Sequence, residues 1–177
     1  IREVTRAFNI PALELENYEA DDIIATLATR ALNEEVRTVV VTSDKDLMQL
    51  VVKDRCSLLD TMKDAHYDPE GVKEKMGVYP HQIVDYLALL GDSVDNIPGV
   101  PGIGTKRAAG LLRQAVPPTL DGVLALASVP ASASQVKLPK KCLENLREYA
   151  AVARVCKRLT TIDTVPDADA LGVDGVE

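Results

Sequence analysis

Tryptophan is absent from these 177 residues, and one phenylalanine and five tyrosines are the only aromatic side chains. So little aromatic surface argues against a protein that binds single strands by stacking their bases. The cysteines Cys56, Cys142 and Cys156 are far apart and contain no C-x-x-C pair, so neither a zinc site nor a disulfide framework is expected. No apolar run is long enough to span a membrane, and no signal-peptide pattern opens the chain, which predicts a cytoplasmic protein without a membrane partner.

The residues that are present are sufficient for one compact domain, because 46% of them are apolar. The first residue is Ile1 rather than Met, which suggests a processed or truncated chain. The net charge of -7 is unevenly distributed: acids outnumber bases in residues 1–98, bases outnumber acids in residues 99–158, and residues 159–177 contain no Lys or Arg. This distribution is typical of a nuclease that holds metal ions with one part and a phosphate backbone with the other, although chance clustering on solvated helices explains it equally well.

The order of the predicted elements indicates an α/β protein with a helical end. In the first hundred residues, helices are expected at 2–8, 21–35, from 68 and at 79–90, and strands at 11–15, 36–42 and 56–59. The β-branched run at 36–42 predicts a parallel strand that is buried on both faces. From residue 105 onward only helices are expected, at 105–113, 120–127 and 139–159, with loops at 117–118 and 128–134 between them.

Acidic residues form three groups at the ends of these elements. Glu19, Asp21 and Asp22 begin the second helix, Asp44 and Asp46 follow the strand at 36–42, and Asp92 and Asp95 lie in a loop between two helices. Carboxylates cap helix N-termini and turns, so each group has a purely structural interpretation. The second group also lies where α/β proteins bind ligands, at the carboxyl end of a parallel strand.

If the three groups converge, seven carboxylates share one pocket. Each pair about 5 Å apart then repels by roughly 3 kcal/mol at an effective dielectric constant near 20, so the pocket requires cations. Ligand sets made only of oxygen favour Mg²⁺ or Mn²⁺. Two such ions activate water and stabilise a leaving oxygen, and this predicts hydrolysis of phosphodiester bonds.

A glycine-rich turn at 99–104 leads into the helix that starts at Thr105. Glycine lets the main chain approach a phosphate closely, and the N–H groups at a helix start can bind that phosphate without reading sequence. A purely structural turn is the alternative. The candidate DNA-binding residues are Gly99, Gly102, Gly104, Thr105, Lys106 and Arg107, and weaker candidates are Lys140, Lys141 and Arg147.

Three strings carry a resemblance to a known family: Y-E-A-D-D (18–22), T-S-D-K-D-L-M-Q-L (42–50) and L-L-G-D-S-V-D-N-I-P-G-V-P-G-I-G-T-K (89–106). In the same order, they resemble the 5′ nuclease domain of bacterial DNA polymerase I, a member of the flap endonuclease family. The resemblance implies a PIN-like fold in which a mixed, largely parallel central sheet is flanked by helices and followed by a helix-hairpin-helix region. It divides the chain into a nuclease core at 1–98, a DNA-binding region at 99–160 and an acidic tail or linker at 161–177.

The resemblance also implies an activity, namely structure-specific 5′-3′ exonuclease or flap endonuclease cleavage in DNA replication and repair. Its substrates would be DNA with 5′ ends, flaps or nicks, cut by a monomer whose chain continues into a polymerase domain. Two Mg²⁺ or Mn²⁺ ions would lie in the pocket, and K⁺ at the hairpin. Asp21 and Asp22 would lie nearest the catalytic ions and, with Asp44, would be the catalytic residues. Glu19 would act partly through water, and Asp92 and Asp95 would complete the second metal site. The metal-pocket acids would be Glu19, Asp21, Asp22, Asp44, Asp46, Asp92 and Asp95.

Part of the family pattern has no counterpart in this sequence. The first strand with its metal-binding Asp, a later strand-end acid and the basic arch are not found, and Ile1 matches the pattern about one third of the way in. We therefore expect the 177 residues alone to cleave weakly or not at all.

Two other functions fit parts of the sequence. A DNA-binding module without catalysis would use the hairpin and keep the acids as caps. A phosphatase would use Asp44 as nucleophile and Asp46 as acid, but such enzymes carry Thr where this chain has Met48, and they have no use for the hairpin.

Overall fold

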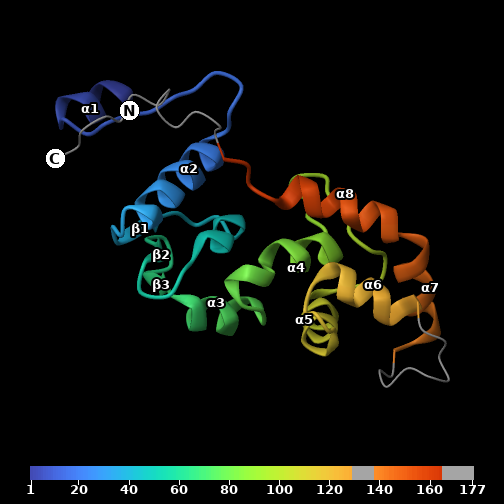
Figure 1. Cartoon of the computed structure of the whole chain (residues 1–177). Helices are drawn as coiled ribbons and strands as arrows, with labels where there is room; N and C mark the ends of the chain where they lie inside the picture. The colour runs from blue at the N-terminus through green and yellow to red at the C-terminus, as the bar shows by residue number, and fades with distance from the viewer. Residues whose placement is uncertain (129–137, 165–177) are drawn as a thin grey trace.

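The computed structural model of the chain describes residues 1–128 and 138–164 (Figure 1). The first half contains α1 (Arg2–Ala7), α2 (Ala20–Asn33), β1 (Thr38–Val41), the 3₁₀ helix η1 (Asp46–Leu50), β2 (Cys56–Asp60), β3 (Ala65–Tyr67) and α3 (Pro69–Met76). The second half contains the 3₁₀ helix η2 (Pro80–Gln82), α4 (Ile83–Leu90), α5 (Thr105–Gln114), α6 (Leu120–Ser128), α7 (Lys140–Glu148) and α8 (Ala150–Thr160). None of the described helices is long and apolar enough to cross a membrane.

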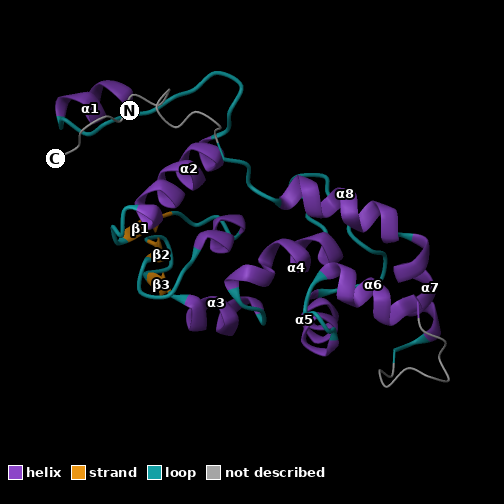
Figure 2. Ribbon diagram, in the orientation of Figure 1, coloured by secondary structure: helices purple, strands orange, loops and turns teal. Residues whose placement is uncertain are grey.

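The three strands form one small mixed sheet in the first half of the molecule (Figure 2). β1 and β2 run parallel, with Val39 opposite Ser57, whereas β2 and β3 run antiparallel, with Leu59 opposite His66. The parallel pairing confirms the expectation for residues 36–42, and the mixed sheet with flanking helices confirms the predicted fold class. β3 was not predicted because it is only three residues long.

Two strand predictions are wrong in ways that the packing explains. β1 is buried on one face only, because Val40 is 7% exposed but Val39 and Val41 are 54% and 62% exposed. α2 packs against β1 and covers one face of the strand, so the opposite face with Val39 and Val41 stays open to solvent. Residues 11–15 form no strand, since no described strand lies beside them to share hydrogen bonds.

The second half is helical, and α4 is its centre. α4 buries Ile83, Leu87 and Leu89 completely and packs against α5, α6 and α8. An ion pair between Lys157 Nζ and Asp85 Oδ1, 2.7 Å apart, joins α8 to α4. This attachment brings the end of α8 toward the sheet.

The single helix expected at 139–159 is instead two helices, α7 and α8, which meet at Tyr149. The sequence around Tyr149 contains no Gly or Pro from which a helix break could be predicted. α7 packs mainly on α6 while α8 packs mainly on α4, so the chain turns between them to bury two apolar faces on different partners. Most of the loop expected at 128–134 lies outside the described residues.

Two glycines fix the loop that follows α4. Gly91 (φ +79°) ends that helix, and Gly99 (φ +61°) packs directly on it, so a Cβ on Gly99 would lie 2.4 Å from Gly91 N. Asp92 and Ile97 exchange two backbone hydrogen bonds of 2.8 and 2.7 Å. The loop that carries Asp92 and Asp95 is therefore held closed against the start of the glycine hairpin.

Candidate functional site

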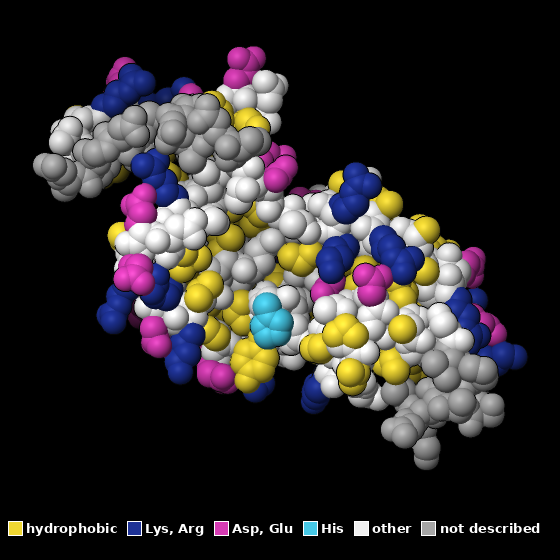
Figure 3. All heavy atoms as spheres, viewed as in Figure 1, with side chains coloured by type: hydrophobic (Ala, Val, Ile, Leu, Met, Phe, Trp, Pro, Cys, Tyr) yellow, Lys and Arg dark blue, Asp and Glu magenta, His cyan; other side chains and the backbone are white. Residues whose placement is uncertain are grey.

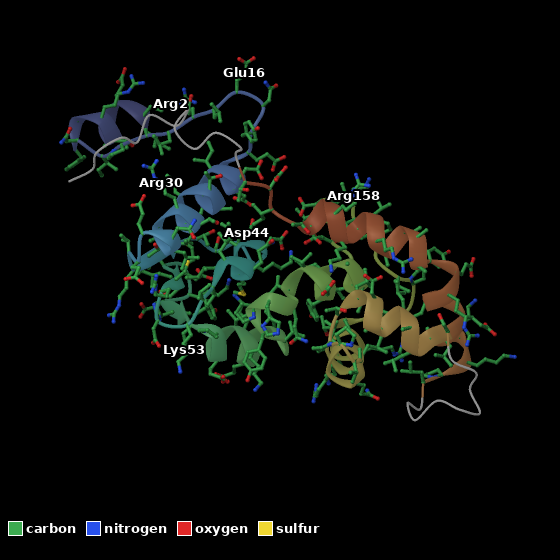
Figure 4. All side chains as sticks on the ribbon, viewed as in Figure 1. Arg2, Glu16, Arg30, Asp44, Lys53 and Arg158 are labelled. Atoms are coloured by element: carbon green, nitrogen blue, oxygen red, sulfur yellow. The ribbon has the colours of Figure 1, made fainter. Side chains whose placement is uncertain are left out.

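An open cavity of about 550 Å³ lies between the start of α2, the turn after β1, the loop after α4 and the end of α8. Asp44 lies at this junction in Figure 4. Six of the seven predicted acids line the cavity: Glu19, Asp21, Asp22, Asp44, Asp46 and Asp95. The seventh, Asp92, lies beside it and lines a neighbouring cavity. The three groups, which are far apart in the sequence, therefore do converge.

The first group lies at the N-terminus of α2, as the sequence predicts. Asp22 Oδ2 accepts a hydrogen bond of 3.1 Å from the Glu19 backbone N–H, which caps the helix. Its Oδ1 accepts a 3.2 Å bond from the N–H of Asp163, which is 141 residues away. Asp22 thus caps a helix and also lines the cavity, so the two interpretations of this group are compatible.

The second group follows β1, where the strand ends and η1 begins. The Asp44 N–H donates to Thr42 Oγ1 at 3.0 Å, and Asp44 Oδ1 accepts from the Asp46 N–H at 2.9 Å. These local bonds turn the chain sharply after the strand. As a result, both carboxylates line the cavity at the carboxyl end of the parallel pair, where α/β proteins bind ligands.

The tightest acidic cluster joins the second and third groups. Asp46, Asp92 and Asp95 each offer a carboxylate oxygen, and these three oxygens lie within 4.8 Å of one another. Asp46 Oδ1 is buried and has no hydrogen-bond partner. A buried carboxylate oxygen without a donor is costly unless a cation lies nearby.

Lys45 supplies one positive charge to this cluster. Its Nζ forms an ion pair with Asp92 Oδ2 and lies 3.7 Å from Asp46 Oδ1. The other Asp92 oxygen accepts a 2.9 Å hydrogen bond from the Val94 N–H. Both oxygens of the buried Asp92 are therefore engaged within the protein.

The electrostatics of the pocket follow from this crowding. Burial, and then the charge of Asp44, raise the pKa of Asp21. Burial also raises the pKa of Asp46 to about 6 against the lowering effect of Lys45, and the charges of the neighbouring carboxylates add to the rise. The hydrogen bond from Lys45 lowers the pKa of Asp92. A cation in this pocket would relieve the repulsion that holds Asp21 and Asp46 toward their protonated forms.

Sequence reasoning missed three contributors to the site, Lys45, Gln49 and Asp163. Lys45 and Gln49 lie within the string at 42–50, of which only the two acids Asp44 and Asp46 were predicted to belong to the site. Asp163 lines the cavity from the segment after α8, a segment interpreted from sequence as the start of a tail. No local pattern could have found Asp163, because the fold of α8 against α4 is what brings it there.

The hairpin residues divide into a buried and an exposed set. Gly99 is buried against Leu90 and Gly91, so its role is close packing. Gly102 (φ +78°) and Gly104 are exposed, and a Cβ on Gly104 would meet nothing within 4 Å. The exposed set at the start of α5 is Gly102, Gly104, Thr105, Lys106 and Arg107.

Side-chain donors fasten the hairpin from within the protein. The Arg107 guanidinium donates to the Gly102 carbonyl, and the Asn145 amide donates to the Pro101 carbonyl at 2.7 Å. Among the weaker candidates, Lys140 and Lys141 are exposed on α7, whereas Arg147 donates to the Ala127 carbonyl and so joins α7 to α6. Further Lys and Arg side chains cover the face over α7 and α8 (Figure 3).

Comparison with known proteins identifies the family of this chain. Residues 1–77 match the family model of the 5′-3′ exonuclease N-terminal resolvase-like domain, and residues 78–171 match that of the 5′-3′ exonuclease C-terminal SAM fold. The chain belongs to the 5′-3′ exonuclease family. The resemblance inferred from the three strings is thereby confirmed.

Curated relatives of this exonuclease-family chain are mostly much longer proteins. DNA polymerase I of Bacillus caldotenax is 46% identical over 92% of this chain, and that of Rhizobium leguminosarum is 46% identical over 97%. A 5′-3′ exonuclease of Aquifex aeolicus is 43% identical over 64% of the chain and 39% of its own length. The chain spans 18% and 16% of the two polymerases.

Solved structures share the fold at low sequence identity. A T5 5′-exonuclease with bound divalent metal ions (zinc) superimposes with a TM-score of 0.74 at 22% identity, over 88% of this chain and 54% of that one. A bacteriophage T5 flap endonuclease, captured as a pseudo-enzyme-product complex with DNA and metal ions, gives a TM-score of 0.73 at 22% identity, over 90% and 55%. At this identity the likeness establishes the fold alone.

Proposed function

We propose that this chain forms part of a structure-specific 5′-3′ DNA nuclease in replication and repair that hydrolyses phosphodiester bonds with two divalent metal ions. The observation that carries the proposal is the convergence of acids from three distant segments, six of them around one cavity and the seventh, Asp92, beside it. The family of the chain and its polymerase relatives support the same function. In such relatives the nuclease and polymerase belong to one chain, and we extend that arrangement to this protein.

The residues present fit hard divalent cations. The ligands are carboxylate oxygens only, which favours Mg²⁺ or Mn²⁺ over softer metals. The buried Asp46 Oδ1 lacks a donor, and two adjacent carboxylates, Asp92 and Asp95, offer oxygens within 4.8 Å. Asp21 and Asp44, whose charges act on each other, would hold a second ion nearer the start of α2.

The ions supply, when bound, Lewis-acid stabilisation and an acidified water. The protein's part is to keep Asp44 fixed through the Asp46 N–H and Asp22 fixed through the N–H groups of Glu19 and Asp163, so that little reorganisation accompanies binding. Lys45 holds Asp92 in place and keeps one positive charge beside the cluster. An open cavity leaves room for the scissile phosphate next to these groups.

DNA would be held by its backbone at the exposed hairpin. Gly102 and Gly104 leave the main chain accessible, and Lys106 and Arg107 add positive charge at the N-terminus of α5. The resemblance also implies K⁺ at this hairpin. The carbonyls of Val100, Pro101 and Gly102 accept hydrogen bonds from Ile103, Asn145 and Arg107, and each carbonyl oxygen has a second lone pair for such an ion. We therefore assign the DNA contact to backbone N–H groups and basic side chains, with K⁺ as a further proposed ligand of the hairpin.

The test is metal binding by the 177-residue chain. Isothermal titration calorimetry with Mn²⁺ should detect binding to the wild-type chain, and Asp44→Asn should weaken it at least about tenfold. Asp54→Asn is the matched control, since Asp54 is exposed outside the cavity and its φ of +60° suits Asn. Equal Mn²⁺ affinity in wild type and Asp44→Asn would refute the metal site.

A non-catalytic DNA-binding module remains the second candidate, because several of the acids do perform capping roles. Asp22, Asp44 and Asp92 each accept a backbone N–H. Metal binding separates the two functions, because the 177 residues alone are expected to cleave weakly or not at all. Mn²⁺ affinity that is lost in Asp44→Asn supports the nuclease, whereas binding of a 5′-flap duplex by a chain without Mn²⁺ affinity supports the module.

A further inference from the structure

The segment Thr160–Asp163, which begins with the last residue of α8, lies along the acidic cavity and is fastened there by several hydrogen bonds. All four of its residues line the cavity. Thr160 is buried, whereas Asp163 is exposed. In Figure 1, the loop after α8 runs to the start of α2, so a segment from the helical half completes a pocket otherwise built by the first half and the loop after α4.

Gln49 is the side chain that fastens this segment. Its Nε2 donates to the Asp46 carbonyl at 2.9 Å and to the Thr160 carbonyl at 3.0 Å, and its Oε1 accepts from the Ile162 N–H at 3.2 Å. One half-buried amide thereby joins the turn that carries Asp46 to Thr160 and Ile162, the two residues on either side of Thr161. The sequence separations of 111 and 113 residues make these bonds tertiary rather than local.

The fastened segment delivers Asp163 to the acids at the start of α2. The Asp163 backbone N–H donates to Asp22 Oδ1 at 3.2 Å, which fixes its main chain against a pocket carboxylate. Asp163 therefore adds a seventh acidic residue to the lining of a cavity that already has six, and its Oδ1 accepts a 2.9 Å hydrogen bond from the Thr164 N–H. Bringing another negative charge to this place is unfavourable unless a cation shares it.

We propose that Gln49 is a positioning residue and that Asp163, which it holds over the cavity, is a further cation-binding carboxylate. This inference rests on the proposed metal-dependent function. Gln49 contacts neither metal nor substrate, and it acts by orienting the segment 160–163. Asp163 then binds a divalent ion in the outer part of the pocket, on the side of Asp21 and Asp22.

The first arm of the experiment measures metal affinity on the 177-residue chain by following free Mn²⁺ with electron paramagnetic resonance. Asp163→Asn should weaken Mn²⁺ binding about tenfold, as expected for the loss of one anionic ligand. Gln49→Met, which keeps the volume but loses all three hydrogen bonds, should weaken it to a similar extent. The matched controls Asp54→Asn and Gln114→Met should stay within about twofold of wild type, because both residues are exposed outside the cavity.

The double variant tests whether the two residues act as a unit. If Gln49 works by presenting Asp163, adding Asp163→Asn to Gln49→Met causes no further loss of Mn²⁺ affinity. Losses that multiply would overturn the positioning role, and wild-type affinity in Asp163→Asn would overturn the role of Asp163. Because Asp163 is exposed, Asp163→Asn is expected to fold. This variant keeps the test decisive even if Gln49→Met does not fold.

The second arm needs no metal and separates this inference from the proposed function. Amide hydrogen exchange at Ile162 and Asp163 should speed up at least about tenfold in Gln49→Met, because their protection depends on the fastened segment. Unchanged exchange would overturn the positioning role even in a chain that binds Mn²⁺. If Asp44→Asn binds Mn²⁺ as wild type does, the proposed function and the role of Asp163 both fall, whereas failure of Asp163→Asn alone leaves the proposed function standing.

Discussion

Lys45 and Asp92 form an ion pair that joins the turn after β1 to the loop after α4. The Asp92 side chain is only 5% exposed, and Lys45 also lies 3.7 Å from the Asp46 carboxylate. One lysine thus keeps two acidic segments together at the edge of the cavity. In the chain without metal, the Lys45 ammonium thus supplies part of the positive charge that the proposed metal ions would supply to the same carboxylates.

Lys45→Met should destabilise the metal-free chain by about 2 kcal/mol, because the buried Asp92 loses its charged partner. The loss should shrink when Mg²⁺ is added, since a divalent ion can replace the missing charge. Urea unfolding with and without Mg²⁺ measures both effects. Lys53→Met is the control, because Lys53 is exposed on the sheet side and lines no cavity with the acids (Figure 4). A Lys45 variant as stable as the control would contradict the prediction.

Stability of the metal-free chain should fall between pH 4 and pH 6. The folded-state pKa of Asp46 is raised from 3.8 to about 6, so the folded state binds the proton more tightly than the unfolded state. The resulting stabilisation is fully present below pH 4 and is lost as pH rises through 6, by up to about 3 kcal/mol. The pKa of Asp92 is lowered, so this residue has the opposite effect: it makes the folded state more stable as pH rises, and it does so below pH 4.

The measurement for this prediction is the midpoint of urea unfolding at several pH values. Asp46→Asn should flatten the fall between pH 4 and pH 6, and saturating Mg²⁺ should do the same in wild type, since a bound cation favours the ionised carboxylate. A wild-type profile that rises over this range in the absence of metal would show that Asp46 does not behave as its surroundings indicate.

Gly99→Ala should destabilise the fold by about 3 kcal/mol, through the left-handed backbone angle and through overpacking. Its Cβ would meet Gly91 N at 2.4 Å and the Leu90 carbonyl carbon at 2.6 Å, both of them rigid backbone. Gly104→Ala is the matched control, with φ of −95° and open space around the new methyl, and should cost less than about 1 kcal/mol. Thermal unfolding compares the two, and equal melting temperatures would contradict this account of the hairpin.

Lys106→Ala and Arg107→Ala should each weaken binding of duplex DNA, by a similar factor for unrelated sequences. Phosphate contacts carry no sequence information, and each one lost should reduce the slope of log K against log salt by about 1. Fluorescence anisotropy at several salt concentrations provides these slopes, with Lys53→Ala as the control. If the slopes of both variants equal that of the control, the hairpin does not contact phosphate.

Local patterns in the sequence were enough to predict most helices, the parallel pairing of β1 and the identity of the acids. Each of these depends on neighbours within a few residues: the Asp68 cap before Pro69, the apolar spacing in α2 and the β-branched run in β1. The break at Tyr149 and the exposed face of β1 did not follow from such patterns. They depend on which surfaces are available to cover an apolar face, and this is a property of the whole fold.

The sequence by itself therefore determined which residues are candidates to bind cations and phosphate, because charge, glycine content and spacing are local chemical facts. Only the tertiary structure decided which of them meet. It placed Asp92 in a pair with Lys45, turned Gly99 inward and brought Asp163 to Asp22 across 141 residues. The physical reason is that packing α8 on α4 and closing the loop after Gly91 set these distances, and such packing is encoded by the complete set of buried contacts rather than by any one segment.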